Sequence, residues 1–175
     1  MLAKLKTIAD LKEELKDLDS KVISIKSDKY TTKATQKLAD AFDEFGKYFI
    51  ENGFKVEKKE MSTSAVYKTE KITLAKSGFR DWLLHLGVNG KEIGSVSIEV
   101  TRKTMTSSSR SYTAGGSDDL EREISLLTQQ IETAKLDLAS VNDLEFCYII
   151  EAPDKKVEFG KEYESFKEVI EKLIN

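Results

Sequence analysis

The sequence predicts an α+β fold: an antiparallel sheet of about five or six strands, helices packed on one face, and a long heptad-bearing helical arm or hairpin. Apolar residues alternate with polar ones from Phe54 to Lys103, which is the period of a half-buried strand. They recur at spacings of three and four in residues 8–25 and again in residues 117–141, which is the heptad pattern of pairing helices. With 175 residues, the chain is long enough for a single domain, 1–175, with its own core.

The first predicted helix spans residues 1–26 and needs a partner. Lys, Glu and Asp surround its apolar stripe, and charge pairs on an exposed helix face contribute only a few tenths of a kcal/mol each. Its stability must therefore come from burying the stripe against another helix. The stripe consists of Ile8, Leu11, Leu15, Leu18, Val22 and Ile25.

A second helix is expected to begin at Thr31 or Thr32, because the polar run from Ser27 interrupts the heptad pattern. Its apolar stripe is mostly aromatic, and burial of such side chains against a sheet is a strong driving force for folding. The dipeptide Asn52-Gly53 predicts a left-handed turn that ends the helix. The stripe consists of Leu38, Phe42, Phe45 and Phe49.

The period of two after Gly53 predicts a meander of antiparallel strands. Four strands are expected, one at Phe54 and Val56, one around Val66, Ile72 and Leu74, one with Trp82, Leu84, Leu86 and Val88, and one with Val96, Ile98 and Val100. Asn89-Gly90 is a strong hairpin signal between the last two. A strict two-residue loop would place Leu84 opposite Ser95, whereas a longer loop or a bulge near Gly94 places it opposite Val96. We expect the latter, because a one-residue slip turns every apolar side chain to the wrong face.

Residues 104–116 are rich in Ser and Gly and predict a flexible linker, which leads into a long helix over residues 117–141. Ser117 or Asp118 can cap that helix, and three acidic residues in its first turn suit the helix dipole. Its heptad seam is expected to pair with the seam of residues 1–26, within one chain or across a homodimer. The seam consists of Leu120, Ile124, Leu127, Ile131, Ala134, Leu138 and Val141.

The last part of the chain predicts a buried strand, a hairpin and a short helix. Residues 144–151 are nearly continuous in apolar side chains, and Pro153-Asp154 is expected to turn the chain into a strand with Val157 and Phe159. Ser165 and Glu168 have the spacing of a capping box. The core-facing stripe of the final helix is Phe166, Val169, Ile170 and Leu173.

Composition narrows the class of protein. The net charge is −3, which gives no strong field toward nucleic acid or membrane, but the charge is uneven. Residues 52–110 hold 11 Lys and Arg against 6 Asp and Glu, a balance of +5, and the rest of the chain holds 17 against 25, a balance of −8. One cysteine, Cys147, excludes an intramolecular disulfide and suits a reducing compartment, and no apolar run is long enough to span a bilayer. We therefore expect a cytoplasmic protein without a membrane partner.

Residues suited to catalysis are few, and the sequence predicts no enzyme and no cofactor. His85 and Cys147 lie within predicted strands and are expected to be structural. A divergent metal-dependent nuclease is a minor alternative, for which Asp81, Glu99 and Lys103 come nearest to the required set. Gly115-Gly116 precedes a helix, but the aspartates that follow would repel a phosphate, which argues against nucleotide binding.

A nucleic-acid surface is the main alternative to a protein-binding role. A basic sheet edge and the Ser-rich loop could follow a phosphate backbone, and tyrosines are available for stacking on bases. Against this, Lys is common on exposed strands because it discourages edge-to-edge pairing, and glutamates interrupt the row. The residues of this surface are Lys68, Lys71, Lys76, Arg80, Arg102, Lys103, Arg110 and Tyr112.

These observations favour a non-enzymatic protein that binds another macromolecule through protein–protein contacts, as an adaptor, a regulator or an inhibitor. An inhibitor of a larger nucleic-acid-acting or defence complex, of the kind that a mobile element encodes, would suit the small size and the segregated charge. The partner's identity does not follow from the sequence. The chain itself is expected to be a monomer with a helical hairpin or a homodimer.

Overall fold

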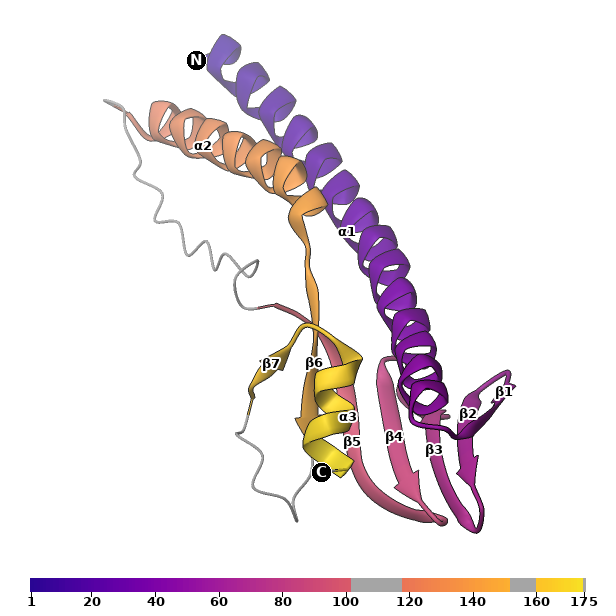
Figure 1. The fold of residues 1–175 in the computed structure, drawn as a ribbon. Coiled ribbons are helices and arrows are strands. Elements are labelled where there is room, and N and C mark those ends of the chain that lie inside the picture. Colours follow the sequence, from indigo (N-terminus) through magenta and orange to yellow (C-terminus); the bar gives the residue numbers. More distant parts are fainter. Residues whose placement is uncertain (102–117, 152–159, 175) are drawn as a thin grey trace. The chain divides into compact units, whose positions relative to one another are not determined.

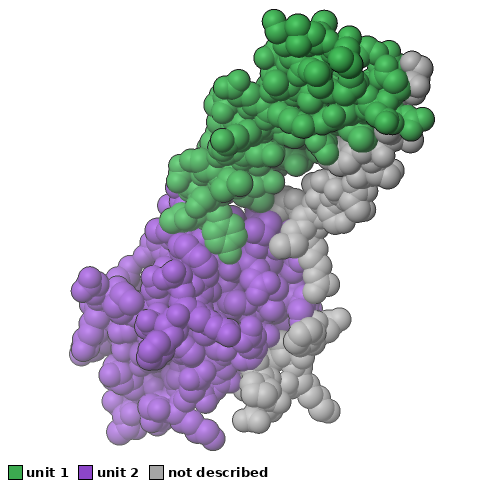
Figure 2. Space-filling model, turned by 180° about the vertical axis from the view of Figure 1, so that it is seen from behind, with its two compact units in different colours: residues 1–31, 104–144 green, residues 32–103, 145–175 purple. Residues whose placement is uncertain are grey.

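The computed structural model describes residues 1–101, 118–151 and 160–174, and these form two compact units. Figure 2 shows the first unit, residues 1–31 and 104–144, and the second unit, residues 32–103 and 145–175, in different colours. The predicted linker at 104–116 and the predicted hairpin strand with Val157 and Phe159 lie outside the described residues.

The elements follow one another along the chain as shown in Figure 1. They are α1 (Leu2–Glu51), β1 (Lys55–Lys59), β2 (Ser62–Tyr67), β3 (Glu70–Lys76), β4 (Leu83–Val88), β5 (Lys91–Val100), α2 (Asp119–Ser140), the 3-10 helix η1 (Val141–Asp143), β6 (Phe146–Glu151), β7 (Glu162–Tyr163) and α3 (Phe166–Ile174). The described residues thus form an α+β fold with an antiparallel sheet, as the sequence predicts.

Helix α1 is continuous, so the predicted break between two N-terminal helices is wrong. The segment from Ser27 to Thr32 contains no Gly or Pro. Ser, Asp and Thr cost at most about 0.7 kcal/mol each in a helix interior, which neighbouring turns can overcome. The boundary between the two compact units nevertheless falls at Thr31–Thr32. The polar run therefore marks a change of packing partner and not the end of a helix.

The C-terminus of α1 ends as Asn52-Gly53 predicts. Gly53 has a φ of +82°, a conformation that only glycine adopts without strain. Its N–H donates to the Ile50 carbonyl at 3.0 Å, and the Phe54 N–H donates to the Phe49 carbonyl at 2.9 Å. The Phe49 and Phe54 rings pack edge to face with centroids 5.1 Å apart. This is a Schellman cap, in which an apolar contact closes the turn.

Over the described residues, the sheet has seven strands in sequence order, and every neighbouring pair is antiparallel. Two strands, β2 and β3, occupy the region around Val66 and Ile72 where one was predicted. The turn between them is not a Gly or Asn turn, because Lys68 takes the positive φ of 54°. A lysine in this conformation is uncommon and gives no turn signal in the sequence.

The β4–β5 hairpin contains the predicted bulge. Asn89 and Gly90 have φ values of 52° and 82°, as a two-residue type I′ turn requires. Beyond the turn the register shifts, so that Gly87 lies opposite Glu92 but Leu86 lies opposite Gly94. This leaves Leu84 opposite Val96, and both are fully buried. The bulge is what keeps the apolar side chains of both strands on one face.

The second half of α1 and helix α3 cover that face of the sheet (Figure 1). The Tyr148 hydroxyl on β6 donates to the Lys37 carbonyl on α1 at 2.8 Å, and the Tyr148 ring meets the Phe166 ring of α3 at 5.2 Å. Burial raises the pKa of Tyr148 far above its usual value. The core side chains with the least exposure are Phe45, Leu74, Leu84, Leu86, Val96, Ile98, Tyr148, Phe166, Val169, Ile170 and Leu173.

Helix α3 receives its N-terminal cap from another helix. The Glu44 carboxylate on α1 accepts hydrogen bonds from the Phe166 N–H at 2.7 Å and the Lys167 N–H at 3.1 Å. The Ser165 hydroxyl accepts from the Glu168 N–H at 3.3 Å, as the capping spacing predicts. A carboxylate at the positive end of a helix stabilises it. Glu44 thereby fixes α3 on the sheet.

Replacing Glu44 by alanine should lower the free energy of unfolding by about 1–2 kcal/mol, because two first-turn N–H groups lose their charged acceptor. Urea denaturation followed by circular dichroism measures the change. Glu51→Ala is the matched control, because Glu51 is exposed on the same helix. If both variants lose equal stability, the cap contributes nothing beyond the change in helix propensity.

In the first unit, α1 and α2 lie side by side and run in the same direction. The Lys4 ammonium contacts Asp118 at 2.7 Å and Glu121 at 2.8 Å, and Lys135 contacts Glu14 at 2.8 Å. Residue numbers therefore rise in the same direction along the two helices. Within this unit the two helices are therefore parallel, which the long connection between them along the chain permits.

The N-terminus of α2 begins as predicted. Asp118 caps it, since its carboxylate accepts from the Glu121 N–H at 2.8 Å. None of the described helices is both long enough and apolar enough to cross a membrane.

Candidate protein-interaction surface

The sheet face opposite α1 and α3 is called here the open face. Side chains alternate along a strand, so the register assigns residues to it: Ser64 pairs with Thr73, His85 with Ser95, and Ser97 with Ile149. Hydroxyl side chains recur on this face, and the Ser64 and Thr73 hydroxyls lie 3.3 Å apart. Short side chains allow another surface to approach the sheet closely.

Charge on the open face is segregated by strand. Strands β5, β6 and β7 place only glutamates there among their charged residues, namely Glu92, Glu99, Glu151 and Glu162. Strands β1 and β3 place Lys55, Lys59 and Lys71 there, beside Glu57. The half of the open face formed by β5–β7 is therefore acidic, and we call it the acidic half.

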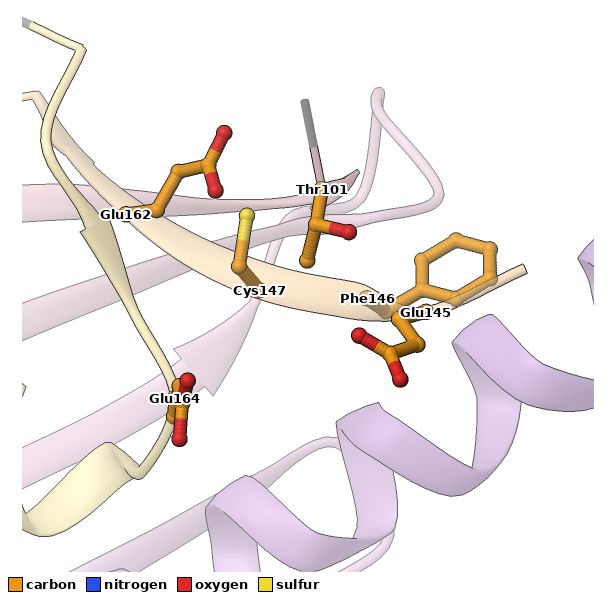
Figure 3. Close-up of a pocket in the computed structure, with 6 residues that line it drawn as sticks. All are labelled: Thr101, Glu145, Phe146, Cys147, Glu162 and Glu164. Atoms are coloured by element: carbon orange, nitrogen blue, oxygen red, sulfur yellow. The ribbon is translucent and has the colours of Figure 1, made fainter. Parts of the chain in front are cut away.

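A pocket of about 580 Å³ lies at the end of the acidic half (Figure 3). The Thr101 N–H donates to the Glu145 carbonyl at 2.9 Å, which extends the β5–β6 ladder to the pocket. Among the residues that the structure describes, three carboxylates and no Lys or Arg line it, so these residues favour a positively charged group there. The lining residues are Thr101, Glu145, Phe146, Cys147, Glu162 and Glu164.

Cys147 in this pocket is buried, as the sequence predicts. Figure 3 shows its sulfur on the same side of β6 as the Glu162 carboxylate. Burial, followed by the nearby Glu162 and Glu99 charges, raises the pKa of the thiol to about 11. The thiol is therefore protonated at neutral pH, and its Sγ lies 3.6 Å from the Glu99 carbonyl as a weak donor. A protonated, buried thiol is a poor nucleophile.

The residues considered for metal-dependent cleavage are only partly brought together. The β4–β5 register places Leu83 opposite Ser97, and the Ile98 N–H donates to the Trp82 carbonyl, so Asp81 and Glu99 occupy facing positions. The Ser97 hydroxyl donates to Glu99 at 2.9 Å. Lys103 lies outside the described residues. Within residues 1–101, 118–151 and 160–174, no group of three His, Cys, Asp or Glu side chains is placed to hold a metal ion.

His85 lies half-exposed on the open face. Its Nδ1 lies 3.0 Å from a Glu92 carboxylate oxygen across the bulge. This contact joins β4 to β5 and gives the histidine a structural partner.

The predicted basic residues do not gather on one face. Lys71 begins β3 on the open face, whereas Lys76 ends the same strand on the helix-covered face. Lys68 occupies the β2–β3 turn at one end of the sheet, and Arg80 lies in the β3–β4 connection at the other end. The other residues of the predicted surface, Arg102, Lys103, Arg110 and Tyr112, lie outside the described residues.

The seam residues on α1 and α2 differ in burial. Leu127 and Ile131 on α2 are buried. Ile8, Val22, Ala134 and Val141 are buried as well, and Ile25 is exposed. The remaining seam residues are half-buried, namely Leu11, Leu15, Leu18, Leu120, Ile124 and Leu138. The pairing of these helices as a coiled coil stays a prediction.

The acidic half was missed by the sequence analysis, although a signal for it exists. Glu99 stands between Ile98 and Val100 in the sequence, so the period of two already assigns it to the face opposite those apolar residues. Finding that the glutamates share a face requires the order β5–β6–β7, which joins residues about 50 positions apart. Comparisons of the chain with protein-family models, with curated proteins and with solved structures found no match.

Proposed function

We propose that this protein is a non-enzymatic adaptor, regulator or inhibitor that binds a basic surface of another protein with the acidic half of its open face. The observation that carries the proposal is the charge pattern: β5, β6 and β7 present only glutamates among their charged residues on the sheet face opposite α3 and the second half of α1. Complementary charge speeds encounter and suppresses wrong partners.

The class of partner follows from the usual function of basic surfaces on proteins. Proteins that bind nucleic acid carry Lys and Arg to neutralise phosphates. An array of glutamates beside short hydroxyl side chains offers such a protein an alternative to the phosphate backbone. This supports an inhibitory role against a nucleic-acid-acting or defence complex, in a reducing compartment such as the cytoplasm, which the single cysteine suits.

Direct nucleic-acid binding is supported less well by the described residues. Lys71 and Lys76 point to opposite faces of β3, and the acidic half would repel a phosphate backbone.

The charge pattern can be tested with the double variant Glu99→Lys and Glu162→Lys. We expect capture of the partner protein from a lysate of the source cells to fall at least about tenfold, because two attractive charges become repulsive. Capture by the wild type should survive nuclease treatment and weaken as salt is raised, because salt screens exposed charges. Mass spectrometry and quantitative blotting measure both effects.

Glu57→Lys is the matched control, since Glu57 is an exposed glutamate on the open face but on β1. It should leave capture unchanged. If the captured material disappears with nuclease, or if the double variant captures as well as the control, the acidic half is not the binding surface.

A further inference from the structure

The open face carries opposite charge on its two sides. On the acidic half the charged residues are the four glutamates named above, and all of these are exposed except Glu162, which is half-buried. The half formed by β1, β2 and β3, called here the basic half, presents three exposed lysines and one exposed glutamate, namely Lys55, Lys59, Lys71 and Glu57. Four glutamates give the acidic half a balance of −4, and three lysines against one glutamate give the basic half +2.

Strand pairing places these charges on one face, although they come from distant parts of the sequence. Lys55 and Lys71 both pair with Val66, one from each side, so all three side chains point the same way. Glu162 pairs with Ile149 in the same manner. Strand β4 lies between the two halves in the strand order of the described residues. The open face is therefore bipolar.

A bipolar face is complementary to itself. A two-fold axis that lies between two stacked copies and separates the halves exchanges them, so the acidic half of each copy faces the basic half of the other. Each attractive contact then occurs twice. The reverse stacking, with like half over like half, is disfavoured by charge repulsion, so charge selects one orientation.

The middle of the open face allows two sheets to approach. Thr73, Ser95 and Ser97 have short side chains, and sheets that stack face to face lie about 10 Å apart. The seven described strands, about 4.8 Å apart and about 20 Å long, give a face of about 600 Å² per copy. Stable interfaces bury about 800 Å² per partner, so a contact over this face would be weak and reversible.

We propose that the open face is a self-association surface, on which a second copy of this chain packs with its basic half over the acidic half and its acidic half over the basic half. The occupant is a second copy because the face itself supplies both signs of charge that the contact needs. The dimer rests on the charge pattern alone. Its consequence, competition with the basic partner protein for the acidic half, rests on the proposed function.

The purified full chain tests the dimer without any partner. Sedimentation equilibrium at low salt should show monomers and dimers in exchange. Raising the ionic strength from about 0.01 M to about 1 M shortens the Debye length from about 30 Å to about 3 Å, so the dissociation constant should rise at least about tenfold. A chain that stays monomeric up to about 1 mM at low salt, or a dimer that salt does not weaken, overturns the proposal.

Charge reversal tests which surfaces meet. The acid-reversed form carries Glu99→Lys, Glu151→Lys and Glu162→Lys, and the base-reversed form carries Lys55→Glu and Lys71→Glu. In each form the two halves have charge of the same sign, so each form alone should be monomeric where the wild type is dimeric. An equimolar mixture of the two forms should dimerise again, because a positive face then meets a negative one.

The control carries Lys47→Glu and Lys167→Glu, which change the net charge as much as the base-reversed form does. Both lysines are exposed on α1 and α3, the helices that cover the other face of the sheet. This control should dimerise like the wild type, and circular dichroism checks that every form keeps the wild-type fold. The proposal is wrong if a reversed form dimerises like the wild type, if the mixture stays monomeric, or if the control becomes monomeric.

Partner capture separates the dimer from the proposed function. The base-reversed form keeps the acidic half intact, so it should capture several-fold more partner than the wild type at concentrations where the wild type is dimeric. Equal capture would overturn the competition. If the wild type dimerises but the base-reversed form captures no partner, the proposed function fails and the dimer stands. If the wild type is monomeric but captures a partner through the acidic half, the dimer fails and the proposed function stands.

Discussion

Replacing Phe45 by alanine should lower the free energy of unfolding by about 3–5 kcal/mol. Phe45 is 0% exposed and packs against Phe49 with ring centroids 4.7 Å apart. It lies on the part of α1 that covers the sheet, and its removal would leave a cavity between layers that are both held by backbone hydrogen bonds. Most domains are stable by only 5–15 kcal/mol, so this loss is a large share of the total.

Ile50→Ala is the control for Phe45→Ala, because Ile50 is a large exposed apolar residue on the same helix. Its change should stay within about 0.5 kcal/mol. Chemical denaturation followed by tryptophan fluorescence and circular dichroism measures both variants. Equal losses of stability at the two positions would mean that the Phe45 side of α1 does not face the sheet.

The aromatic stripe shows how far a sequence pattern specifies burial. The spacing predicts correctly that Phe45 and Phe49 enter the core, but Leu38 and Phe42, on the same stripe, are only half-buried. A helix stripe is wider than the line of closest contact with a sheet, and sequence spacing does not locate that line. The strongly periodic α3 is better specified, since all four of its predicted core residues are buried.

Turns were predicted where their residues have a backbone preference. Gly53 and Gly90 adopt positive φ as glycines do, and both turns were found in advance. Lys68 also adopts a positive φ, but lysine has no preference for this conformation. The sequence therefore gives no turn signal there, and the β2–β3 hairpin was missed. The pairing of β2 with both neighbours is what holds Lys68 in this conformation.

The candidate site was the least predictable part of the molecule. The basic set was defined by closeness in sequence, but the alternation of β3 separates Lys71 from Lys76. The acidic half, in contrast, draws Glu99 and Glu162 together from distant segments through strand pairing. Surface patches depend on tertiary pairing, which local periodicity does not encode.

Leu127→Glu should detach α2 from α1 and melt much of α2. Leu127 is 7% exposed, and the Lys12–Glu123 ion pair at 2.7 Å and the Glu14–Lys135 ion pair at 2.8 Å lie on either side of it along α2. Losing a buried leucine alone costs about 2–5 kcal/mol, and a carboxylate in its place must also be desolvated. A helix of 22 residues without a partner is only marginally stable in water.

The matched control for Leu127→Glu is Leu136→Glu, because Leu136 is 58% exposed on the same helix and receives the same substitution. We expect a clear loss of helical ellipticity for the first variant and none for the second.

Light scattering distinguishes the two ways in which the seam can be covered. If the wild type is monomeric and Leu127→Glu loses helicity at constant mass, the seam is closed within one chain, as the ion pairs between α1 and α2 suggest. If the wild type is a dimer and the variant halves its mass, the half-buried seam leucines also pair between copies. Unchanged helicity and mass would show that Leu127 does not face α1.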